Sequence, residues 1–181
     1  NTFFVRGNHD DHLPNSANLW QNYFTAAARP LPAGVTNYVG IDSKSSYLSY
    51  SFDYGNSRYI GLDTDADAAQ PTSAQLTFLD SRLTDAENLG LTHAFIYFHP
   101  PEYCVESTHC NCQTTTGCGP STTFVSIINR HPIVSATFHG HEHILAWVHM
   151  SNARVPGLTH QYEEFVTSSS GAPYGLTPYP A

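Results

Sequence analysis

The chain has 181 residues, of which 12% are charged, and a net charge of −8. This length favours one domain that is large enough to bury a core, while the charged fraction is about half of the usual share. An acidic chain without a basic cluster argues against a nucleic-acid backbone or an anionic membrane as the main partner. A phosphate-containing substrate would then need local positive charge, which metal ions can supply.

No apolar run approaches the roughly 18 to 20 residues of a membrane span, and no signal peptide is visible. The chain starts at Asn1 and enters directly on residues 2–5, Thr-Phe-Phe-Val, which predict a core strand. We therefore expect the sequence to begin inside a longer unit, so that the missing targeting segment carries no information about the compartment.

The first predicted strand leads into a polar turn, Gly7-Asn8-His9-Asp10-Asp11-His12. The carboxamide oxygen of Asn8 suits a divalent cation, and His9 could ligate a metal, donate a proton or stabilise charge. The alternative is an Asx-type turn that caps the next helix.

The next segments predict a helix, a hairpin and a second helix. Apolar residues recur at helical spacing between residues 16 and 27, and a loop follows to about residue 45. Residues 47–54 and 58–63 alternate on either side of a Gly-Asn turn, which predicts a β-hairpin. Residues 70–83 predict an amphipathic helix packed on the sheet.

The second half of the chain predicts further strands of an α/β fold. Residues 93–98 form an apolar run that ends at His99, where two prolines stop the strand. A helix over 122–129 and a buried strand over 133–138 complete the order needed for a right-handed crossover. Residues 144–168 alternate weakly and predict a second, more antiparallel sheet. No repeat and no inner boundary divides the chain, so residues 1–181 form a single predicted domain.

All four cysteines lie in one Thr- and Gly-rich loop, at Cys104, Cys110, Cys112 and Cys118. An even number so clustered predicts two disulfides and an oxidising, extracellular compartment, with three possible pairings. Pairing Cys110 with Cys112 would make a strained small ring, which favours two bridges that both cross the loop. The alternative is a structural zinc site that includes His109, although the Cys-x-x-Cys hairpins typical of such sites are absent.

Three histidines separated by single residues, His139, His141 and His143, follow the predicted strand 133–138. Gly140 allows a tight turn at this point, and a neutral imidazole nitrogen is a common ligand for Zn, Mn and Fe. Because the chain has eleven histidines, such spacing can also arise by chance.

Other strand ends make chance a poor explanation. Asn8, His99 and His141 each follow a predicted strand. Because polar groups at the carboxyl ends of neighbouring strands meet at one edge of a sheet, we expect these side chains to build one metal site.

Three blocks in this order resemble the later signature blocks of the calcineurin-like metallophosphoesterases: Gly7-Asn8-His9-Asp10, His99-Pro100-Pro101 and Gly140-His141-Glu142-His143. The hairpin around Tyr50-Ser51-Phe52-Asp53-Tyr54-Gly55 also resembles a segment of that family, so the resemblance spans nearly the whole chain. It implies a four-layer α/β/β/α sandwich, two mixed sheets flanked by helices, with a two-metal centre at the sheet edge.

By this resemblance, Asn8, His99 and His141 would hold one metal, and His143 would help to hold the other. His9 would lie near the leaving group as a proton donor or stabiliser of developing charge. The family assigns no role to His139, and we expect it, with Asp10, to lie behind the ligands. Two divalent or trivalent ions, Mn, Fe or Zn, would lower the pKa of a bridging water from about 15.7 towards neutrality and align it for attack on a phosphate ester.

The sequence departs from the family upstream of Gly7. Family members carry an Asp-x-His pair and a Gly-Asp whose carboxylate bridges the metals, and neither occurs here because the chain starts at Asn1. The spare carboxylates stand in other contexts, at Asp10, Asp11, Asp63 and Asp65. A competent centre would therefore need an N-terminal part, either in a longer chain or as a bound fragment of the same protein.

The sequence thus predicts a secreted metallophosphoesterase-like hydrolase of phosphate mono- or diesters. The alternative, from a different class, is a non-catalytic extracellular binding or self-assembling protein built on a partial phosphoesterase fold. The two differ in whether the upstream ligands exist in the protein.

Overall fold

The structure is a computed structural model that describes residues 3–11, 14–24, 31–41, 48–64, 71–103, 105 and 121–167. The four cysteines and His109 lie outside the described residues, and so do the predicted disulfides and the alternative zinc site. Among the described helices, none is long and apolar enough to cross a membrane.

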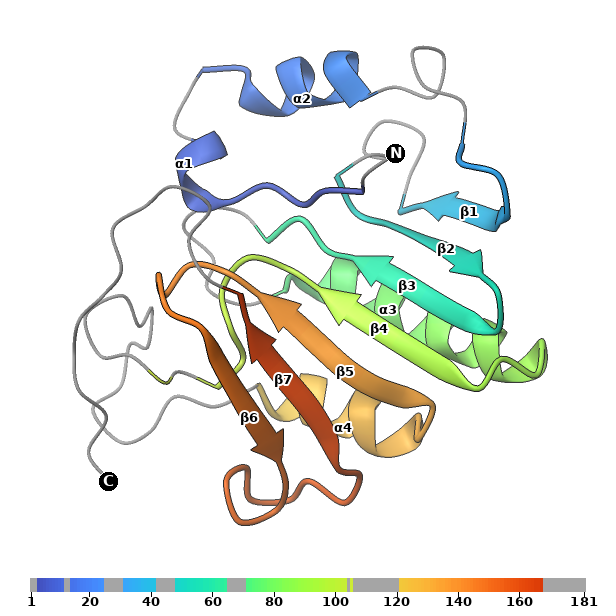
Figure 1. The fold of residues 1–181 in the computed structure, drawn as a ribbon, viewed down its shortest axis with the longest axis vertical. Helices are drawn as coiled ribbons and strands as arrows, with labels where there is room; N and C mark the ends of the chain where they lie inside the picture. Colours follow the sequence, from blue (N-terminus) through green and yellow to red (C-terminus); the bar gives the residue numbers. More distant parts are fainter. Residues whose placement is uncertain are drawn as a thin grey trace.

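One mixed sheet of seven strands forms the centre of the described structure, in the order β1-β2-β3-β4-β5-β7-β6 (Figure 1). Strands β3, β4, β5 and β7 run parallel to one another, and antiparallel pairs extend the sheet on both sides. The strands are β1 (Val35–Gly40), β2 (Tyr50–Tyr54), β3 (Ser57–Gly61), β4 (His93–Tyr97), β5 (Val134–His139), β6 (Ala146–Met150) and β7 (Tyr162–Val166).

The sheet confirms some of the predicted strands and corrects others. The hairpin is confirmed, since β2 pairs antiparallel with β3. The prediction of a second sheet after residue 143 is wrong, because β7 pairs parallel with β5 and carries β6 at the edge of the same sheet. Residues 3–7 form no strand, and β1 lies within the predicted loop. Weak alternation in these segments does not reveal which strand they will pair with, since pairing is a long-range contact.

Four helices accompany the sheet: α1 (Asn8–Asp11), α2 (Ser16–Phe24), α3 (Ser73–Asn88) and α4 (Thr122–Arg130). Helix α3 begins with a capping box, in which Thr72 Oγ1 accepts from the Gln75 N–H and Gln75 Oε1 accepts from the Thr72 N–H. Ser121 caps α4, where its hydroxyl oxygen accepts from the Phe124 N–H. The Thr72 cap explains why α3 starts at Ser73 and not at the predicted residue 70.

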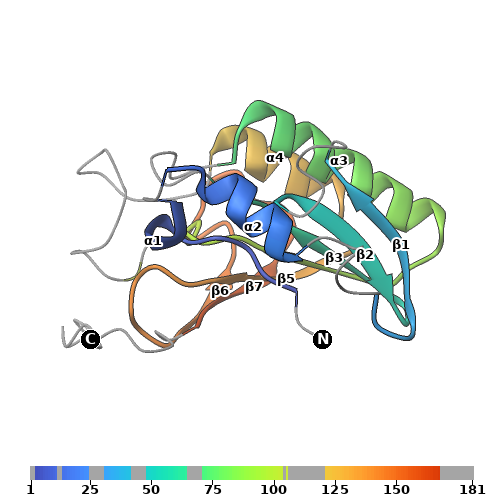
Figure 2. The same cartoon turned by 90° about the horizontal axis from the view of Figure 1, so that it is seen from above.

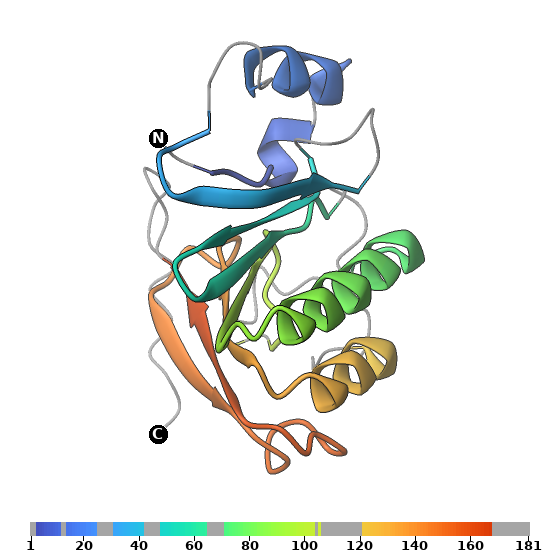
Figure 3. The ribbon, with the colours of Figure 1, turned by 90° about the vertical axis from the view of Figure 1, so that its right-hand side faces the viewer.

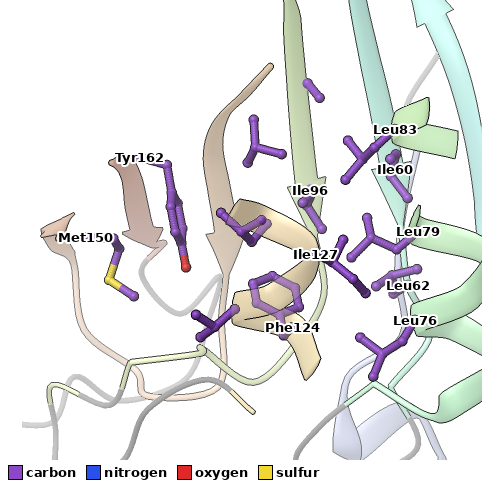
Figure 4. Close-up of a cluster of buried hydrophobic side chains, with 14 of the residues drawn as sticks. Ile60, Leu62, Leu76, Leu79, Leu83, Ile96, Phe124, Ile127, Met150 and Tyr162 are labelled. Atoms are coloured by element: carbon purple, nitrogen blue, oxygen red, sulfur yellow. The ribbon is translucent and has the colours of Figure 1, made fainter. Parts of the chain in front are cut away.

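The hydrophobic core lies between the sheet and two helices on one of its faces. Figures 2 and 3 show α3 and α4 side by side on the same face. Ile60 and Ile96 from the strands meet Leu79 and Phe124 from the helices, and all four side chains are fully buried (Figure 4). Each such burial contributes about 1.5 to 3 kcal/mol, so this layer anchors the strands whose ends carry the polar blocks.

The other face of the sheet carries a row of aromatic rings. Neighbouring rings lie 5.1 to 6.3 Å apart, centroid to centroid. Near the β6 end, Phe138 is 37% exposed and Trp147 is 72% exposed. At the β2 end, the ring of Phe3 stacks on Phe52 at 3.9 Å. The row consists of Phe52, Tyr59, Phe95, Phe138, Phe165 and Trp147, and we call it the aromatic row.

Candidate metal centre

The carboxyl ends of β4 and β5 bring two of the polar blocks together. These strands are parallel neighbours, so the loops that follow them leave the sheet at the same edge. The Gly140 N–H donates to the His99 carbonyl at 2.9 Å, and the Phe98 N–H donates to the Phe138 carbonyl at 3.2 Å. The backbone therefore holds the His99 loop against the loop that carries His141 and His143.

Helix α1 brings the third block to the same place. Arg6, just before this helix, is buried and donates to both carboxylate oxygens of Asp63 at 2.8 and 2.6 Å. Arg6 also donates to the Ser16 hydroxyl at 2.9 Å. Asp63, one of the spare carboxylates in the sequence, is thus engaged by Arg6 and fastens the α1 segment to the end of β3.

Three neutral donor atoms converge at the shared edge. His99 Nε2 lies 2.9 Å from Asn8 Oδ1 and 3.2 Å from His141 Nδ1. The two imidazole rings are nearly perpendicular, at 78°. Two donors bound tetrahedrally to one zinc ion at 2.0 to 2.1 Å would lie about 3.3 Å apart. Both separations from His99 Nε2 are therefore close to the spacing of two ligands of one metal ion.

Two glycines make room for the His99 ring. A Cβ on Gly7 would lie 2.9 Å from His99 Cε1, and a Cβ on Gly140 would lie 3.4 Å from His99 Nδ1. A real Cβ atom essentially never approaches as closely as the first distance. The glycines of both motifs therefore serve the packing around His99.

The loop after β5 has unusual backbone geometry. His141 has φ 68° and His143 has φ 54°, both in the left-handed region. Residues other than glycine adopt this region rarely, and such strain clusters at functional sites. The conformation is maintained in part by a tight turn in which the Glu142 N–H donates to the Gly140 carbonyl at 2.8 Å.

The electrostatics keep His99 neutral. Its pKa is lowered to about 4, mainly by burial and then by the nearby His141, with smaller effects of His9 and His143, while Asp10 opposes them. A neutral imidazole retains the lone pair that a metal requires. The effects of His9 and His143 on this pKa place both side chains in the electrostatic surroundings of His99.

The two residues predicted behind the ligands have distinct contacts. Asp10 Oδ2 accepts from the Gly7 N–H at 2.9 Å, which fixes the start of α1. His139 is buried, which lowers its pKa to about 3, and its Nδ1 donates to the Phe98 carbonyl at 3.0 Å. Each therefore supports the backbone next to a predicted ligand.

Sequence reasoning missed Glu142 and Glu164, two of the buried carboxyl groups near the site. Glu142 and Glu164 are both fully buried. Glu142 stands between two predicted ligands, and Glu164 takes an inward position of β7 between Tyr162 and Val166. A carboxylate at an inward strand position is the signal that could have drawn attention to the second of them.

The donor set is neutral throughout. Within the described residues, no group of three or more His, Cys, Asp or Glu side chains could hold a metal ion. The converging set combines one carboxamide with two imidazoles. Two metal ions with a combined charge of at least +4 would require negative ligands as well, and Asp65 lies outside the described residues. The three converging donors among the described residues thus include no carboxylate.

No family model and no curated protein matches this sequence. Among solved structures, the fold is similar to that of a purple acid phosphatase isolated from yellow lupin (Lupinus luteus) seeds, with a TM-score of 0.53 and 14% sequence identity. The match covers 83% of this chain and 27% of the phosphatase, so this chain spans about a quarter of the length of that protein. At this identity, the similarity shows the fold alone.

Proposed function

We propose that this chain forms part of a metallophosphoesterase-type hydrolase that cleaves phosphate mono- or diesters. The observation that carries the proposal is the convergence of Asn8 Oδ1, His99 Nε2 and His141 Nδ1 at one sheet edge. These atoms would hold one metal, and His143 would help to hold a second. When bound, Mn, Fe or Zn ions would supply charge neutralisation and a water of lowered pKa.

A side chain of the protein would assist departure of the leaving group. His9 stands at the start of α1 beside the ligands, where it would donate a proton to the leaving oxygen or stabilise its charge. No nucleophilic side chain is required. Secretion and two disulfides among the four cysteines remain part of the proposal.

We propose further that a second β-layer covers the aromatic row, which completes the four-layer α/β/β/α sandwich. An apolar sheet face requires a covering layer, and two sheets pack with aromatic and aliphatic side chains between them. Residues 3–5 already lie against this face, since Phe3 stacks on Phe52 and the Phe4 carbonyl accepts from the Tyr50 hydroxyl at 2.7 Å.

The uncovered part of this face leads to the metal edge. A groove of about 470 Å³ extends from Phe52 and Phe95 to His99 and Gly140. A second layer that fills the groove would reach the donor atoms from the side that the described residues leave open. Its strands would supply the missing carboxylates, either from a longer chain or from a bound fragment of the same protein.

The test is native mass spectrometry of the protein purified without chelator, together with hydrolysis of p-nitrophenyl phosphate and bis(p-nitrophenyl) phosphate. We expect two metals, additional polypeptide mass and hydrolysis. His99→Ala should remove metal and activity, while His93→Ala, at the opposite end of β4 with a hydrogen bond to Ser135, should retain both. Metal-loaded protein that hydrolyses neither ester would overturn the proposal.

The exposed end of the aromatic row favours the second candidate, a self-assembling protein without catalysis. Phe138 and Trp147 together present an apolar surface at the β6 side of the sheet, and such surfaces drive association. A native mass that is a multiple of 181 residues, without metal, would support this candidate instead.

A further inference from the structure

Glu142 and Glu164 each hold backbone N–H groups of the same short segment. Glu164 accepts from the Glu102 and Tyr103 N–H groups, and Glu142 accepts from the Val105 N–H, all at 3.2 Å. Both carboxyl groups are fully buried, where an acid without such partners would cost several kcal/mol. These hydrogen bonds therefore compensate for the burial of the two carboxyl groups.

The segment needs these carboxyl groups because of the residues before it. Pro100 and Pro101 have no N–H and cannot donate to a neighbouring strand. The first N–H groups available after His99 are therefore those of residues 102 to 105, and Glu142 and Glu164 accept three of them. The carboxyl groups replace the strand pairing that the prolines prevent, and they fix the direction in which the chain leaves His99.

Glu142 also determines how its neighbours face. It is fully buried, whereas His141 and His143 on either side are half-buried. Its side chain is directed inward to the Val105 N–H, while the neighbouring left-handed His141 contacts His99. A left-handed residue other than glycine costs about 1 to 3 kcal/mol, and an inward anchor between two of them offsets part of this cost.

Glu164 reaches the site through one intermediate residue. His139 Nε2 lies 3.6 Å from Glu164 Oε2, and His139 Nδ1 donates to the carbonyl of Phe98, the residue before His99. The Thr167 N–H, at the end of β7, donates to the His139 carbonyl at 2.7 Å. Strand β7 thus contacts His139, and His139 contacts the backbone of the residue that precedes His99.

From these contacts we infer that Glu142 and Glu164 are positioning residues for the metal ligands: buried carboxyl groups that hold the segment after His99, Glu142 to the loop of His141 and His143 and Glu164 to strand β7. Neither touches a donor atom in the contacts described above. The inference rests on the proposed metal site. It gives Glu142, which lies between the two ligand histidines, a role in positioning them and not in binding the metal.

The first test measures metal affinity in the complete protein by competing a chelator for bound Co²⁺. Glu142→Ala should weaken binding 10- to 100-fold, the usual effect of removing a group that orients a ligand. Glu142→Gln keeps an oxygen that can accept the Val105 N–H and should remain within about threefold of the wild type. Glu163→Ala, next to Glu164 but on the opposite face of β7, is the matched control and should leave affinity unchanged.

A second variant removes the donor of the same hydrogen bond, the Val105 N–H, in place of its acceptor, Glu142. Val105→Pro deletes the N–H that Glu142 accepts, so it should weaken Co²⁺ binding by a factor similar to Glu142→Ala. If the two groups act through one contact, the double variant should lose no more affinity than either single variant. Additive losses, or unchanged affinity in a variant with a lowered melting temperature, would overturn the inference in favour of a purely structural role.

A metal-free measurement separates this inference from the proposed function. In apoprotein treated with chelator, Glu142→Ala should accelerate amide hydrogen exchange at Val105 and shift the ring NMR signals of His141. Unchanged exchange and unchanged signals would overturn the positioning role whether or not the wild type binds metal. A wild type that binds no Co²⁺ would instead overturn the proposed function, while the apoprotein measurement would still decide the positioning role.

Discussion

Asn8 Oδ1 lies 2.9 Å from His99 Nε2, although the two residues are 91 positions apart in the chain. The contact joins the start of α1 to the end of β4. It places a neutral oxygen beside an imidazole that burial keeps neutral.

Asn8→Asp should raise the pKa of His99 above its value of about 4, because an adjacent negative charge stabilises the imidazolium. A histidine with a lowered folded-state pKa costs stability as the pH falls from its unfolded value of about 6.5. The variant should therefore lose less stability between about pH 6.5 and 4. An NMR titration of the metal-free protein measures this directly, and an unchanged titration of His99 would contradict the contact.

Gly7→Ala should displace the His99 ring, because the new Cβ would lie 2.9 Å from Cε1. Such overpacking costs about 1 to 3 kcal/mol of unfolding free energy and should weaken metal binding as well. Gly140→Ala is the matched comparison, since its Cβ would lie at the milder distance of 3.4 Å. Chemical denaturation and metal titration of both variants would show the difference, and equal effects would count against this packing.

Arg6→Met should destabilise the protein by about 3 to 5 kcal/mol, since it leaves the Asp63 carboxylate buried without its bidentate partner. The exposed pair of Arg130 with Asp80 provides the contrast. Arg130→Met should cost at most about 1 kcal/mol. Urea denaturation of the two variants gives both values, and similar losses would mean that Arg6 does not fasten the α1 segment.

Glu164→Gln should change how stability depends on pH. Burial, with the nearby Glu142 carboxylate, raises the pKa of Glu164 to about 8, while the N–H groups of residues 102 and 103 oppose the shift. A raised folded-state pKa means that the contribution of this carboxyl is fully present below its unfolded value of about 4.5 and is lost as the pH rises towards 8.

The wild type should therefore lose stability relative to Glu164→Gln across that window, by at most about 1.4 kcal/mol per pH unit. The difference in stability between the two proteins reports Glu164 alone, because the histidines contribute equally to both. Their lowered pKa values make stability rise with pH in the acidic range, which is the opposite direction. Melting temperatures measured from pH 4.5 to 8 would reveal this slope, and parallel curves would contradict it.

Trp147→Ser should reduce self-association or the binding of a second layer, because this side chain is 72% exposed and stacks on Phe165. Sedimentation velocity of the metal-free protein provides the measurement. Leu89→Ser, at an exposed position beyond the end of α3, is the control and should behave as the wild type. Equal sedimentation of all three proteins would argue against the aromatic row as an interface.

The sequence by itself determined most of the secondary structure and the list of candidate ligands. The apolar runs of β4 and β5 are short, rich in β-branched and aromatic residues, and end at His99 and His139. Patterns of this kind are local. A strand that is buried between its neighbours requires such an apolar run in any fold. The meeting of His99 and His141 at one sheet edge was therefore predictable from strand ends, whereas Asn8 comes to them from α1, because residues 3–7 form no strand.

Only the tertiary structure decided the contacts between distant segments. It inserted β7 between β5 and β6, joined Arg6 to Asp63 and buried Glu142 and Glu164 beneath the ligand loops. Each of these depends on a partner that no local pattern specifies, because a buried charge is stable only where the fold supplies its donors. Residue type and spacing thus named the candidate ligands, and long-range packing determined which groups hold them in position.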